Sequence, residues 1–199
     1  MTTLVLHTNP TAQWHALVNE AQAAADCQLD QELESYLVFV LMRFADRPEL
    51  AARIFALDFL KGTLAAGHVR QTRLRDVGDQ CLLYSGLFPE QAEQRHVSVN
   101  YFVDLGRTAY QELAALLEHG SAAMFAQLAS GFVSLMDVLL AMRELGDRAP
   151  ALAPLKMLEL GERTGSRYAG NVLRARVDNG RTDVNRFVDF LNSSRIKPH

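Results

Sequence analysis

The chain of 199 residues is long enough for one domain of somewhat above-average size. Apolar residues make up 49% of it and charged residues 22%, the ordinary balance of a globular protein with a real hydrophobic core. A net charge of −3 and a pI near 6.1 exclude the strongly basic composition of a dedicated nucleic-acid-binding protein.

Three features indicate a cytoplasmic protein that does not contact a membrane. Cys27 and Cys81 lack the spacing of a metal site or a disulfide framework, which is typical of reduced core thiols. The first ten residues lack the basic region and long apolar stretch of a secretory signal. The strongest apolar runs, 36–42 and 132–142, are shorter than the roughly 20 residues that cross a bilayer.

Helical periodicity runs through nearly the whole chain, and no long alternating β-branched run indicates a strand. Asn9 and Pro10 are typical of a helix start and predict a first helix to about residue 26. Asp30 predicts the start of a second helix over 31–45, which is apolar almost all the way round and therefore expected to be central and buried. A third helix is expected from about 46 to 62 or 67, and a fourth over 68–86.

The second half of the chain continues the helical pattern. A short helix is expected from Pro89 to 95, and a long one from Ser98 to about His119, where Gly120 would end it. Ser121 begins another long apolar helix, expected to end near residue 145. Shorter helices are predicted over 154–163, 166–177 and 182–191. Together these segments predict an all-α, multi-helix bundle of about seven to nine helices, forming a single domain over 1–199.

Charge is distributed unevenly along the chain. Residues 155–199 contain nine basic and five acidic side chains and carry a net charge of +4, so the preceding 154 residues carry −7. A basic C-terminal subregion on an acidic body could fold back on that body or bind an anionic partner.

Residues 73–110 hold the least ordinary pattern, because glycines interrupt helical segments there. Glycine inside a helix costs about 0.5–1 kcal/mol relative to alanine, so Gly78, Gly86 and Gly106 indicate close helix contact, a bend or a ligand. Gly86 could instead be a left-handed residue that closes the fourth helix.

Single aspartates also lie inside apolar helical segments, at Asp58, Asp104 and Asp137. A buried carboxylate needs a partner, because burying it alone costs several kcal/mol or forces it to take a proton.

Three interpretations of these polar residues stay open. The aspartates could lie on solvated stripes of their helices. They could instead belong to a buried structural network, to which Asp76, Asp79, Gln80, Tyr101 and Arg107 could contribute. The third interpretation is a ligand-binding pocket, formed by the following side chains: Asp79, Tyr84, Asp104 and Arg107. Tyr101, Asp104 and Thr108 share one helical face, as do Asp76, Asp79 and Leu83.

No motif indicates a particular reaction. The Gly-x-Ser-x-Gly, P-loop and Gly-x-Gly-x-x-Gly patterns are absent from the sequence. A carboxylate-bridged metal site in a helical bundle needs two Glu-x-x-His pairs, and the chain has one, Glu93 with His96. We therefore predict no catalytic residue, metal site or cofactor.

A sequence pattern across this region resembles an uncharacterised bacterial family of all-helical proteins. The pattern consists of Gly78-Asp79, Leu83-Tyr84, Ser85-Gly86-Leu87-Phe88, Val97 or Val99, Tyr101, Gly106 and Ala109-Tyr110. It spans about a fifth of the chain, and Leu87 stands where phenylalanine is commoner in the family. The resemblance implies a bacterial, cytoplasmic, all-helical protein and implies no activity or ligand.

The sequence favours a non-enzymatic protein-interaction or regulatory module that contacts a protein partner and forms a homo-oligomer. Two alternatives remain at this point. One is a small-molecule-binding or enzymatic helical domain with a polar pocket in residues 73–110. The other is weak nucleic-acid binding through the basic C-terminal end, which the acidic composition makes the less favoured.

Overall fold

The computed structural model describes residues 9–45, 66–90, 98–146 and 152–179 of the chain. Within these ranges it contains eight helices and no strand, which confirms the predicted all-α class. The chain divides into two compact units, Met1–Ala151 and Leu152–His199. The division lies close to residue 155, where the sequence predicts the start of a basic subregion, and the single domain over 1–199 stays a prediction.

The helices of the first unit are α1 (Pro10–Ala25), α2 (Gln31–Ala45), α4 (Gly67–Gly86), α6 (Val99–Leu116), α7 (His119–Ser130) and α8 (Phe132–Leu145). The second unit contains α9 (Pro154–Thr164) and a helix over 167–179.

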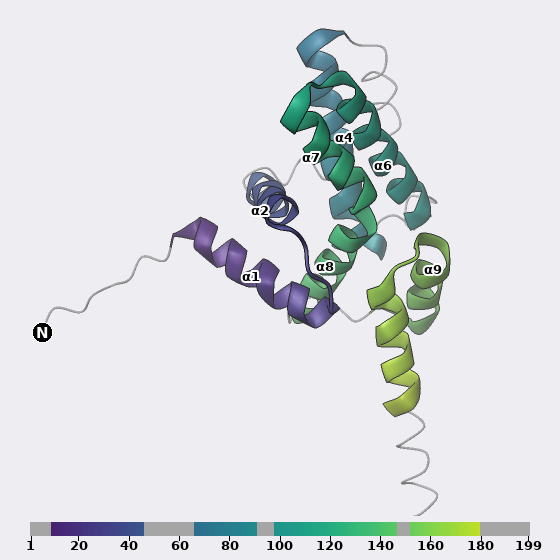
Figure 1. The fold of residues 1–199 in the computed structure, drawn as a ribbon. Coiled ribbons are helices and arrows are strands. Elements are labelled where there is room, and N and C mark those ends of the chain that lie inside the picture. Colours follow the sequence, from purple (N-terminus) through teal and green to yellow (C-terminus); the bar gives the residue numbers. More distant parts are fainter. Residues whose placement is uncertain (1–8, 46–65, 91–97, 147–151, 180–199) are drawn as a thin grey trace, which may run out of the picture. The chain divides into compact units, whose positions relative to one another are not determined.

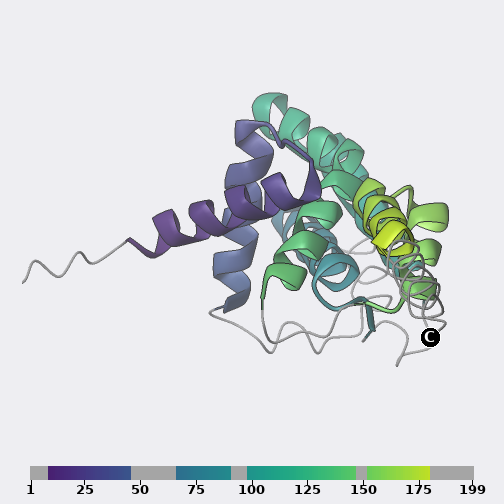
Figure 2. The ribbon, with the colours of Figure 1, turned by 90° about the horizontal axis from the view of Figure 1, so that it is seen from below.

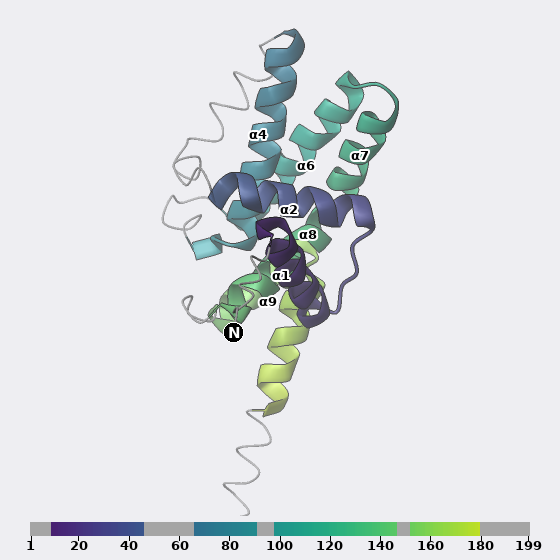
Figure 3. The ribbon, with the colours of Figure 1, turned by 90° about the vertical axis from the view of Figure 1, so that its left-hand side faces the viewer.

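The helices of the first unit pack as antiparallel neighbours crossed by others. Helix α4 lies along α6, and α6 lies along α7 (Figure 1). Helix α1 packs against both α2 and α8 (Figure 2). Helix α2 runs across the direction of α4 (Figure 3). This crossing brings side chains of α2 to α4, and so it matters for the site below.

The predicted helix starts are confirmed by their capping bonds. The side chain of Asn9 accepts a hydrogen bond from the Thr11 amide (3.1 Å), and Pro10 is the first residue of α1. The Asp30 carboxylate accepts from the Leu33 amide at the start of α2 (2.8 Å). These bonds satisfy backbone donors that have no partner inside the helix, which is why the sequence signals them clearly.

Two predicted helix boundaries after Ser98 are wrong. The long helix ends at Leu116 and not near His119, which has a φ of +50° and begins α7. The helix expected from Ser121 to 145 is broken at Gly131, where α7 and α8 meet at a bend of 63°. Gly131 has a ψ of 7°, far from the helical value of about −42°, and a Ser-Gly pair is a common place for a helix to bend.

The predicted role of Gly86 as a left-handed cap is also wrong, because its φ is not positive and Leu87 caps α4 in a right-handed conformation. The predicted helices over 46–62 and 182–191 lie outside the described residues, as does most of the short one after Pro89.

Close helix contact at Gly86 and Gly106 is confirmed. A Cβ atom built on Gly106 would lie 2.6 Å from the Phe132 ring of α8 and 2.8 Å from the Cβ atom of Cys81 on α4. On Gly86 it would overlap the side chain of Leu139 on α8. Helices α4, α6 and α8 therefore approach one another so closely that a residue larger than glycine does not fit at Gly86 or Gly106 without displacing its neighbours.

The side chains at these close helix contacts belong to the buried core of the first unit. Helix α2, which the sequence predicts to be central and buried, has six buried residues, while Phe39 on the same helix is 47% exposed. Helix α8 has the largest buried fraction, with ten of its 14 residues buried. In the described part of the chain no single helix is long and apolar enough to cross a membrane, although the bent pair of α7 and α8 meets both criteria together.

Gly106→Ala is expected to destabilise the protein by about 1–3 kcal/mol, because the added methyl group must displace the Phe132 ring or the Cys81 side chain. Urea denaturation of the purified variant measures this loss. Gly120→Ala is the matched control, since a Cβ atom there meets nothing within 4 Å. Equal stability of the two variants would contradict the close packing at Gly106.

Candidate functional site

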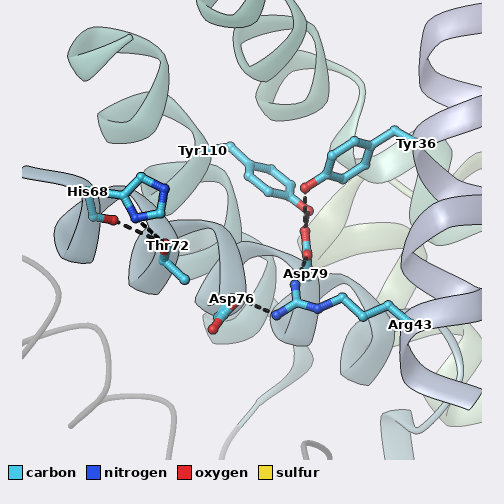
Figure 4. Close-up of polar contacts among 7 residues, drawn as sticks. All are labelled: Tyr36, Arg43, His68, Thr72, Asp76, Asp79 and Tyr110. Carbon is cyan, nitrogen blue, oxygen red and sulfur yellow. Dashed lines mark hydrogen bonds and ion pairs between the residues drawn. The ribbon is translucent and has the colours of Figure 1, made fainter. Parts of the chain in front are cut away.

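The main polar cluster of the first unit is built around Asp79, which lies in α4 and has a side chain with no exposed surface. Its Oδ1 atom accepts hydrogen bonds from the hydroxyl groups of Tyr36 (2.7 Å) and Tyr110 (2.9 Å). Its Oδ2 atom accepts from Nη1 of Arg43 (3.0 Å). Figure 4 shows Tyr36 and Arg43 reaching the carboxylate from one helix, α2, and Tyr110 reaching it from another, α6.

Arg43 extends the cluster along α4. Its Nη2 atom lies 2.6 Å from Oδ1 of Asp76, one turn before Asp79, so one guanidinium bridges two carboxylates. Tyr36 and Arg43 are seven residues apart and therefore on the same face of α2. The Arg43 and Asp76 side chains are 18% and 23% exposed, so the cluster is most exposed at this end.

Aromatic rings enclose the other end of the cluster. Tyr36 and Tyr110 meet edge to face at 6.3 Å between ring centres, and Phe125 of α7 lies within 5.9 Å of both rings. Each such ring pair contributes about 0.5–1.5 kcal/mol of stability beyond the contribution of the surface area that it buries. The rings also keep water from the carboxylate.

Gly78 makes room for this arrangement. A Cβ atom at this position would overlap the ring of Tyr110. Gly78 and Asp79 thus act together, since the glycine admits the tyrosine ring that the aspartate then binds through its hydroxyl group.

The electrostatics follow from burial. Burial raises the pKa of Asp79 to about 6, against the opposing effects of the two tyrosine hydroxyls and of the Arg43 and Arg75 charges. Burial and the Asp79 charge raise the pKa of Tyr36 and of Tyr110, so both hydroxyls keep their protons and remain donors. Burial likewise raises the pKa of the Cys81 thiol, so this cysteine stays an unreactive core thiol.

The four residues predicted to form a pocket differ in exposure. Asp79 and Tyr84 are buried, and the Tyr84 ring stacks on Phe102 at 5.7 Å. Asp104 and Arg107 are exposed on α6, where Asp104 accepts a hydrogen bond from the Asn100 side chain (3.0 Å). Two members of the predicted group are therefore buried and two lie in solvent.

The buried-network interpretation is right for Asp76 and Asp79 and wrong for the partners proposed on α6. Tyr101 is 41% exposed and Arg107 is exposed, whereas the partner from α6 is Tyr110. Sequence reasoning missed Tyr36 and Arg43. Their spacing of two helical turns on an apolar helix is the signal that could have found them.

The embedded aspartates have different environments. Asp137 is buried, with 4% of its surface exposed, while Asp104 lies in solvent and Asp58 lies outside the described residues. Both the solvated and the buried interpretation are therefore correct, each for one residue.

Among the residues described, no group of three or more histidine, cysteine, aspartate or glutamate side chains is placed to hold a metal ion. Glu93 and His96 lie outside these residues.

Comparison of the chain with models of protein families, with curated proteins and with solved structures finds no match. The resemblance to an uncharacterised bacterial family stays an expectation.

The raised pKa of Asp79 predicts a pH dependence of stability. Between about pH 4 and pH 6 the folded state holds a proton on Asp79 that the unfolded chain has lost, so this group's contribution to stability falls as the pH rises. A difference of about two pKa units corresponds to about 3 kcal/mol. Urea denaturation at several pH values should therefore show wild-type stability falling by about this much relative to Asp79→Asn.

Asp79→Asn is the reference here because it removes the titrating group and leaves the other carboxylates in place. A rise in the relative stability of the wild type over the same pH range would contradict this account. It would mean that the donors to Asp79 outweigh its burial.

Proposed function

We propose that the protein is a non-enzymatic interaction or regulatory module that self-associates, with the basic end of one copy meeting the acidic body of another. The observation that supports it most is the closed state of the Asp79 cluster. Both carboxylate oxygens are bonded, the side chain has no exposed surface, and the donors come from two other helices, α2 and α6. This arrangement suits a structural network better than a group that must reach a substrate.

The charge distribution supports self-association. Residues 1–154 carry a net charge of −7 and residues 155–199 carry +4, so each copy contains both an acidic and a basic segment. Opposite potentials speed the encounter of two proteins and favour one orientation over others.

The second unit also exposes apolar side chains. Leu155 is 77% exposed and Leu158, one turn further along α9, is 41% exposed. Apolar side chains next to each other on a surface are typical of contact sites between proteins. We propose that these leucines form the apolar part of the contact.

The two free cysteines fit the proposed cytoplasmic location. Cys81 is buried and Cys27 is half-buried, and reduced thiols of this kind are usual in the cytoplasm.

Light scattering after size exclusion tests the proposal on the full chain. We expect masses above the monomer's 22.1 kDa at low ionic strength, and a shift toward the monomer at about 1 M salt, where charges are screened beyond about 3 Å. The double variant Leu155→Ser/Leu158→Ser should remain folded, because both side chains are largely outside the core, and should associate more weakly.

Val69→Ser/Leu116→Ser is the matched control, with side chains that are 54% and 38% exposed in the first unit. It should associate like the wild type. A monomer under all conditions, or equal association of both double variants, would contradict the proposal.

A further inference from the structure

A pocket of about 230 Å³ lies next to the Asp79 cluster, between α4, the end of α6 and α7. Helix α4 contributes four polar side chains to it: His68, Gln71, Thr72 and Arg75. Gln71 and Thr72 lie three and four residues after His68, and Arg75 lies four and three residues after them, so all four occupy one side of the helix. Figure 4 shows His68 and Thr72 on α4, toward its N-terminal end from Asp76.

Arg75 is the unusual member of this group. Its Nε atom is buried and has no hydrogen-bond partner. Its charge acts on Asp79 and Tyr36 and opposes the rise that burial causes in the pKa of each. The Asp79 oxygens, however, already accept bonds from Tyr36, Tyr110 and Arg43. Arg75 therefore lines the pocket with a positively charged guanidinium group, one of whose donors is buried without a partner.

The wall opposite Arg75 is apolar. It is formed by Leu113 and Leu117 from α6 and its end, and by Phe125 from α7. Phe125 also packs against Tyr36 and Tyr110, so this wall is held in place by the aromatic cluster. The pocket thus combines one cationic side with one apolar side.

The charges around the pocket limit the ligand to a monoanion. Arg43 is already paired with Asp76 and Asp79, and Arg70 is paired with Glu112 at 3.0 Å. Only Arg75 remains among these three cations to meet a ligand. A phosphate group carries about −1.5 to −2 charges near neutral pH and would leave part of its charge uncompensated beside Asp79.

We propose that this pocket binds a small organic carboxylate, whose carboxylate group contacts the Arg75 guanidinium and whose apolar group lies on Leu113 and Phe125. The planar guanidinium matches a carboxylate in geometry and forms charge-assisted hydrogen bonds with it. The pocket is smaller than the roughly 300–1,000 Å³ of sites for drug-sized ligands, so the ligand is a short-chain or single-ring acid. Such a site would give the proposed module an input signal, although it does not depend on that function.

Calorimetric titration of the full chain with sodium benzoate and sodium hexanoate tests this proposal. We expect binding of at least one acid at up to millimolar concentration, and much weaker binding of benzyl alcohol and of inorganic phosphate. Arg75→Gln should weaken binding of the acid by about tenfold or more, because a charge-assisted contact is lost. Arg73→Gln, an exposed position on the same helix, should bind like the wild type.

A second pair of variants covers the case in which Arg75→Gln does not fold. Ser121→Leu places a larger side chain at an exposed position on the pocket's edge and should weaken binding, while Ala123→Leu on the same helix should not. The proposal is overturned if neither acid binds, if phosphate binds better than both, or if each variant binds like its control.

Discussion

The structure of the first unit depends on how one buried carboxylate is satisfied. Asp79 has no exposed surface, and a carboxylate in such a place is tolerated only with donors close by. Tyr36 and Arg43 from α2 and Tyr110 from α6 supply them. Because these residues are far apart in the sequence, their bonds to Asp79 connect α2 and α6 to α4.

Small residues make this connection possible. Gly78 admits the Tyr110 ring beside Asp79, and Gly106 lets α6 approach α4 and α8. A larger residue at either position would push α6 outward and lengthen the bond from Tyr110 to Asp79. The glycines and the carboxylate in residues 73–110 thus serve one purpose, the close packing of helices around a polar centre.

Local features could be predicted from the sequence, and contacts between distant segments could not. Asn9, Asp30 and Ser98 mark helix starts because a capping bond involves only neighbouring residues. The apolar pattern continues across Gly131 and therefore does not indicate the break between α7 and α8. Asp76 and Asp79 were found as network candidates, but their partner Arg43 lies more than thirty residues away, and no local pattern pairs them. Asp104 and Arg107 share a sequence region with Asp79 but lie on the exposed side of α6.

The central claim is that the two tyrosine hydroxyls hold α2 and α6 to Asp79, and a double-mutant cycle of Tyr36→Phe and Tyr110→Phe tests it most directly. Near neutral pH, each single variant should lose about 1–3 kcal/mol of unfolding free energy, because a hydrogen bond to a charged group is removed. The double variant should lose more than the sum, since Oδ1 of Asp79 is then buried with neither donor. Single variants within about 0.5 kcal/mol of the wild type, with an additive double variant, would contradict the account.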